Sequence, residues 1–239
     1  MFANWWNNIK GKTDTPEQGA DTVTVNGRLH LSPKGAQKVI DNLDSLDILL
    51  FAGKGYWFSY FVETVTWSEF SHIGIVLKSP TYLSPKLTGN YLLESGAEKI
   101  RDAEDHKVKW GVQITDLREI LEGYNGRIYY RKLNCPEIRK AHASTEARMR
   151  AIHDVIHNKP YDAYLVDLTR TEFDLNIGDC QRTGRFICSA LVGYVYTELG
   201  LLPAGTEWDL DTPKAFGPGR EIEKKLLRGA RFGDLKRVL

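Results

Sequence analysis

The fold depends on the stretch Arg185-Phe186-Ile187-Cys188-Ser189-Ala190-Leu191-Val192-Gly193-Tyr194-Val195-Tyr196, in which a cysteine stands just before a helical pattern. Apolar residues follow it at three- and four-residue spacing, the period of one helix face: Leu191, Val192, Val195 and Leu199. Gly200 and Pro203 predict where this helix ends. A cysteine at a helix N-terminus meets unpaired backbone N–H groups and the positive end of the helix dipole, and both favour the thiolate. Cys188 is therefore either a nucleophile or a small buried apolar residue.

A histidine lies far upstream, in Ser71-His72-Ile73-Gly74-Ile75-Val76-Leu77. The β-branched residues and their alternation predict a strand that places His72, Gly74 and Val76 on one face. Because glycine has no side chain, Gly74 leaves room beside His72 for another element. His72 is either the partner of Cys188 or an ordinary core or edge histidine.

A carboxylate lies in the next apolar stretch, Tyr91-Leu92-Leu93-Glu94-Ser95-Gly96, which predicts another short strand. Two interpretations of Glu94 stay open. It is either a surface charge on an edge strand or the third group that orients a catalytic imidazole.

These motifs together resemble the NlpC-type papain-like cysteine peptidases. Cys-Ser-x-Leu-Val-x-Tyr-Val-Tyr, followed by Gly200 and Leu-Pro, is similar to their cysteine helix, and residues 47–51, 71–75 and 92–95 resemble their three successive core strands. Those families usually place the cysteine before the histidine, whereas here His72 precedes Cys188. This order resembles the circularly permuted branch, which includes relatives of the lecithin–retinol acyltransferases and often has glutamate or histidine at the position of Glu94.

The resemblance covers roughly residues 45–96 and 158–216 and implies an α+β, papain-like fold: an antiparallel sheet of about five strands with packed helices. It implies a Cys188/His72/Glu94 triad that works through a thioester acyl-enzyme. The Cys188 backbone N–H is the expected oxyanion donor. Tyr161, in a Pro-Tyr-Asp stretch that resembles permuted members, and Ser189 are substrate or oxyanion candidates. No cofactor and no metal is expected.

Composition sets the broad class. A chain of 239 residues with 42% apolar content is long enough for one domain with appendages. We expect an N-terminal extension (1–31), a thiol hydrolase domain (32–216) and a basic C-terminal tail (217–239). A net charge of +1 gives no reason to expect a nucleic-acid partner. Three cysteines without a CxxC motif argue against a disulfide scaffold. With no secretory signal or membrane span visible, the expected compartment is the cytoplasm.

Several further segments carry expectations of their own. Ser32-Pro33 is typical of a helix start. The charged stretch 97–109 predicts a solvated excursion. A helix is expected over 144–158, where His153 and His157 at i and i+4 could share a metal. Because charged residues lie on the same helix face, a solvated face is the favoured interpretation of the two histidines.

Two alternative functions use the same expected fold. One is a lipid acyl hydrolase or acyltransferase that makes peripheral membrane contact through Trp5 and Trp6 or through the tail, which has seven Lys or Arg against three Asp or Glu. The other is a non-enzymatic binding or structural protein. The expected substrates of an enzyme are peptides, acyl lipids or other acyl compounds, because the site residues fit all of them.

Overall fold

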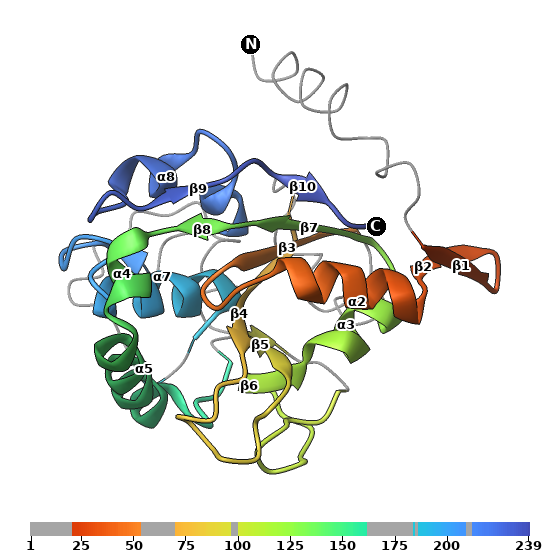
Figure 1. Ribbon diagram of the computed structural model, residues 1–239, viewed down its shortest axis with the longest axis horizontal. Coiled ribbons are helices and arrows are strands. Elements are labelled where there is room, and N and C mark those ends of the chain that lie inside the picture. The colour runs from red at the N-terminus through yellow and green to blue at the C-terminus, as the bar shows by residue number, and fades with distance from the viewer. Residues whose placement is uncertain (1–20, 54–69, 97–99, 162–183, 185, 209–211) are drawn as a thin grey trace, which may run out of the picture.

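The computed structural model describes residues 21–53, 70–96, 100–161, 184, 186–208 and 212–239, and they form a mixed α+β fold (Figure 1). Its centre is a six-stranded sheet in the order β10-β7-β3-β4-β5-β6, in which every neighbouring pair is antiparallel. The strands are β3 (Ile48–Ala52), β4 (His72–Lys78), β5 (Asn90–Gly96), β6 (Gly111–Asp116), β7 (Arg127–Arg131) and β10 (Lys236–Arg237). The positions of β3, β4 and β5 agree with the strands predicted from the sequence, where about five strands were expected in all.

The sixth strand comes from the C-terminal tail, which the sequence analysis treated as an appendage. Besides β10, the tail contains a short helix, α8 (Glu221–Lys225), and β9 (Arg231–Phe232), which pairs with β8 (Leu133–Asn134). The guanidinium of Arg131, a fully buried side chain, donates to the carbonyl oxygens of Phe216 and Gly233 and to the Glu223 carboxylate, each at 3.0 Å. The tail is therefore built into the domain.

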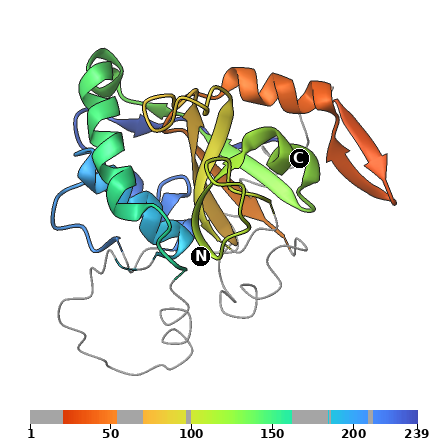
Figure 2. The same cartoon turned by 90° about the horizontal axis from the view of Figure 1, so that it is seen from below.

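The sheet separates two apolar cores, as strand alternation requires. Figure 2 shows α5 (His142–Ile156) and α7 (Cys188–Glu198) on one side of the sheet and α2 (Pro33–Asn42) and α3 (Leu117–Gly123) on the other. Ile73, Ile75 and Leu77 of β4 belong to the first core, whereas Val76 belongs to the second. The predicted alternation of β4 is thus confirmed. A side chain at Gly74 would meet Leu92 of β5, so the space that this glycine leaves is filled by the neighbouring strand.

Local signals place the helix ends. The Ser32 side chain accepts a hydrogen bond from the Gly35 N–H at 3.0 Å and caps α2, as expected from Ser32-Pro33. Asp116 caps α3 in the same way through the N–H groups of Arg118 and Glu119. A short helix α4 (Pro136–Lys140) precedes α5, and a 3-10 turn, η2 (Pro213–Phe216), follows α7. Gly200, with φ at +70°, ends α7 where the sequence predicts.

The described part of the N-terminal extension is a hairpin of β1 (Thr22–Val25) and β2 (Arg28–Leu31), and Leu31 packs into the second core. Trp5 and Trp6 lie outside the described residues. Among the helices that the structure describes, none has the length and apolar character needed to cross a bilayer.

Candidate functional site

Cys188 is the first residue of α7, as the sequence predicts. The residue before it, Ile187, is the N-cap, and its apolar side chain cannot accept a hydrogen bond from the first N–H groups of the helix. Cys188 carries a free thiol and is 6% exposed. A reduced sulfur therefore lies where backbone N–H groups and the helix dipole favour negative charge.

His72 begins β4, opposite Phe51 of β3, and its ring lies 5.4 Å from the Phe51 ring. Its side chain is 2% exposed. Burial lowers the pKa of this imidazole, but the charge and hydrogen bond of Cys188, followed by those of Glu94, outweigh it and raise the pKa to about 10. His72 thus interacts with both predicted partners.

Glu94 holds the other side of the imidazole. Its Oε2 lies 2.8 Å from His72 Nε2. Its second oxygen, Oε1, accepts hydrogen bonds from Thr115 Oγ1 at 2.8 Å and from Gln113 Nε2 at 3.2 Å. The edge-strand interpretation of Glu94 is wrong, because β5 lies between β4 and β6 and the residue is 1% exposed. With Nε2 engaged by Glu94, Nδ1 is the nitrogen left for Cys188.

Three polar residues that support this site were not singled out from the sequence. Gln113 is paired directly with Glu94 across the β5–β6 ladder, and Thr115 lies two residues further along the same face. Ser95, beside Glu94, donates its hydroxyl to the Phe186 carbonyl oxygen at 2.7 Å and so fixes the segment before Cys188. Polar side chains at alternate positions of a predicted strand were the available signal for Gln113 and Thr115.

The two weaker candidates lie beside this arrangement. Tyr161 forms a parallel bridge with Phe186, and the Phe186 N–H donates to the Pro160 carbonyl oxygen at 3.2 Å. Pro160 and Tyr161 of the Pro-Tyr-Asp stretch thus lie alongside the entry to α7, and Asp162 lies outside the described residues. Ser189 is the second residue of α7, next to Cys188, and is fully buried.

Comparisons with known proteins do not indicate which reaction this site performs. No family model matches this chain. No curated protein matches it either. Among solved structures, it is similar to the crystal structure of metalloprotein yiiX from Escherichia coli O157:H7, DUF1105, with a TM-score of 0.42 and 16% sequence identity over 82% of this chain and 97% of that one. A likeness this distant does not bear on what the site does.

Proposed function

We propose that this protein is a cysteine-dependent hydrolase with a papain-like catalytic arrangement, in which Cys188 is the nucleophile. The observation that carries the proposal is the buried series of contacts from Cys188 through His72 to Glu94. A nucleophile, a base in contact with it and a third group that orients the base are the parts that covalent acyl transfer needs. The bond attacked is an amide, an ester or a thioester.

The proposed reaction has two halves. In the thiolate–imidazolium pair the proton of the Cys188 thiol is on His72; the thiolate sulfur attacks the acyl carbonyl carbon, and the N–H of Cys188 donates to the oxyanion. His72 then gives the proton to the leaving group as its bond to the acyl carbon breaks, which leaves a thioester on Cys188. In the second half, His72 takes a proton from water, the hydroxide displaces the sulfur, and the thiol regains the proton.

Glu94 acts in this scheme as a positioning residue. Its Oε1 is held by Thr115 and Gln113, so Oε2 stays directed at His72 Nε2. An Nε2–H that donates to a carboxylate fixes the tautomer whose Nδ1 can accept the thiol proton. The same carboxylate stabilises the cationic ring that forms when the proton is transferred.

The proposal is tested by the rate at which iodoacetamide alkylates Cys188 as a function of pH, with mass spectrometry to separate it from Cys135 and Cys180. The pKa of His72 is raised to about 10, so its positive charge is present at neutral pH and is lost only as the pH rises through that value. We expect fast alkylation near pH 6–7, well below the ordinary cysteine pKa of about 8.5.

The comparison variant is His72→Ala, in which the rate at neutral pH should fall and then rise about tenfold per pH unit toward pH 8.5. Cys135 is buried and serves as an internal reference within each sample. A Cys188 profile that is the same in both proteins would leave the proposed thiolate–imidazolium pair without support.

Glu94→Gln should lower kcat/KM on an activated acyl ester, by up to about 10⁴-fold, because the amide keeps the shape of the side chain but loses the charge that stabilises the imidazolium. Thr115→Val is the matched control. It removes one hydrogen bond to Oε1 and leaves the Oε2 contact with His72, so its effect should be smaller. Equal losses in the two variants would mean that packing at this point of the sheet matters more than the Glu94 charge.

A further inference from the structure

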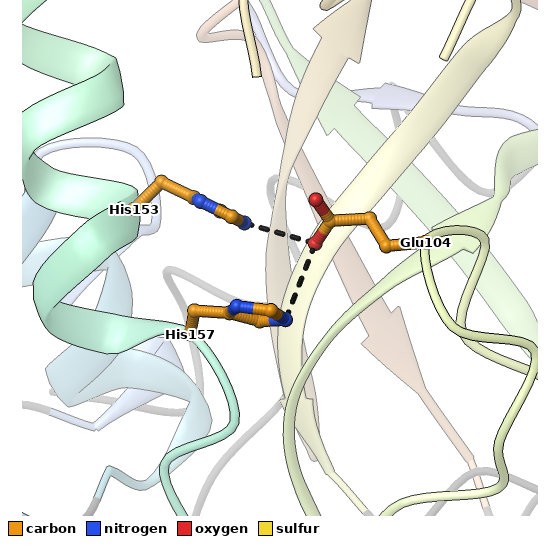
Figure 3. Close-up of side chains that lie close together, drawn as sticks. All are labelled: Glu104, His153 and His157. Atoms are coloured by element: carbon orange, nitrogen blue, oxygen red, sulfur yellow. Dashed lines mark hydrogen bonds and ion pairs between the residues drawn. The ribbon is translucent and has the colours of Figure 1, made fainter. Parts of the chain in front are cut away.

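A second cluster of polar side chains lies between α5 and the excursion that connects β5 to β6. His153 and His157 come from the C-terminal end of α5, and Glu104 comes from the excursion. The two imidazole rings are stacked, with centroids 4.7 Å apart and an interplanar angle of 21°. Figure 3 shows both rings directed at the same carboxylate. The prediction of a solvated helix face is therefore wrong for His153, whose side chain is 12% exposed, whereas the His157 side chain is 37% exposed.

The distances fit a shared cation. Oε2 of Glu104 lies 2.9 Å from His153 Nε2 and 3.6 Å from His157 Nε2, and one ligand atom from each residue lies within 4.8 Å of the others. Tetrahedral Zn²⁺ binds imidazole nitrogen and carboxylate oxygen at about 2.0–2.2 Å, which places neighbouring ligand atoms about 3.3 Å apart. The observed separations lie on either side of that value, so only small side-chain movements are needed.

Glu104 is held in place without help from the histidines. The buried Asp102 accepts hydrogen bonds from the N–H groups of Glu104 and Asp105 at 2.8 and 3.2 Å, and from the Ile114 N–H of β6 at 3.0 Å. Lys109 forms ion pairs with both aspartates, at 3.0 and 3.2 Å. The described part of the excursion is thus anchored to β6 through the buried Asp102, while Arg101, His106 and Lys107 are exposed as its charge pattern predicts. Because the backbone at Glu104 is already held, closing a metal site costs less conformational entropy.

An ion pair with Glu104 explains the position of His153 but not that of His157. His153 is within hydrogen-bonding distance of Glu104, but His157 is not, and its buried Nε2 has no hydrogen-bond partner among the described residues. A buried ring nitrogen without a partner is costly, whereas a metal ion would use its lone pair.

We propose that Glu104, His153 and His157 bind one Zn²⁺ ion, with a water as the fourth ligand. Two imidazoles and one carboxylate form a ligand set that suits zinc. The ion would clamp the excursion to the end of α5. Asp154, at the position of the general base in His-Glu-x-x-His zinc peptidases, is exposed, whereas His153 is mostly buried. We assign the ion the task of holding the excursion against α5, and the site shares no ligand with the Cys188 site.

The test uses the full chain carrying Cys188→Ala, so that this thiol cannot bind the added metal. After treatment with a chelator, Zn²⁺ is titrated by calorimetry and bound metal is counted by mass spectrometry. We expect one equivalent, and a rise in Tm of about 5–10 °C at a free Zn²⁺ concentration of about 100 times Kd. The Co²⁺-substituted protein should show visible absorption bands of tetrahedral geometry.

His157→Ala and Glu104→Gln should each weaken Zn²⁺ binding by at least about 100-fold, since even outer-shell partners of a metal contribute about 10–100-fold. His142→Ala is the matched control, because His142 lies on the same helix and pairs with Glu146 at 3.5 Å, with no third metal ligand beside them among the described residues. Its affinity should equal that of the parent. No bound Zn²⁺ in the parent, or equal binding by all three variants, would overturn the proposal. Since none of these readouts uses turnover, they are separate from the test of the hydrolase.

Discussion

Cys188→Ala should abolish turnover, with kcat falling by about 10⁶-fold on any acyl substrate that the parent hydrolyses, and His72→Ala should have a comparable effect. Alanine at 188 leaves no atom to form the thioester, and alanine at 72 leaves no base beside the sulfur. Because nucleophile and base act as a unit, the double variant should be about as inactive as either single one. The measurement is release of the leaving group from activated acyl esters and thioesters under single-turnover conditions.

Two controls separate chemistry from folding in that experiment. Cys135→Ala also removes a buried thiol, but this residue is the N-cap of α4 and its sulfur lies 4.0 Å from the Arg228 carbonyl oxygen, so turnover should remain. Circular dichroism of each variant checks that the α+β fold is kept. Residual turnover of a folded Cys188→Ala protein above that of buffer would exclude Cys188 as the nucleophile. The binding or structural role would then be the better interpretation of the Cys188 site.

The contacts of the candidate site were predictable from the sequence because its residues lie in strongly patterned segments. Alternation in β4 places His72 on the face opposite Ile73, and the apolar period after Cys188 defines a helix start. The resemblance to the permuted thiol hydrolases then joined these segments. A local sequence pattern does not show which residue a polar side chain contacts. The roles of Gln113 and Ser95 therefore became visible only once the strand register was known.

The tail and the excursion were harder to predict for a related physical reason. Strand β10 is two residues long, too short for alternation to be visible, and its place depends on the pairing of Lys236 with Tyr130. The excursion is highly charged, but Asp102 directs one of those charges inward to backbone N–H groups. Charge counts describe the average exposure of a segment and miss a single carboxylate that organises it.

Gly111→Ala should destabilise the domain by about 2–5 kcal/mol, the sum of backbone strain and overpacking. Gly111 has φ at +149°, which disfavours any residue with a Cβ. An added Cβ would also press against the Lys159 carbonyl oxygen and lie 2.8 Å from the Pro160 Cα, and backbone atoms cannot move aside as a flexible side chain can. Urea unfolding followed by circular dichroism measures the change in free energy of unfolding.

This substitution should also disturb the site, because Gly111 pairs with Pro160, whose carbonyl oxygen accepts from the Phe186 N–H two residues before Cys188. We therefore expect slower alkylation of Cys188 at neutral pH in the folded variant. Gly123→Ala in α3 is the matched control: a Cβ there meets nothing within 4 Å, so stability should stay the same or rise by up to about 1 kcal/mol. If Gly111→Ala matched this control in both stability and alkylation, the pairing of β6 with Pro160 could not be what positions the nucleophile.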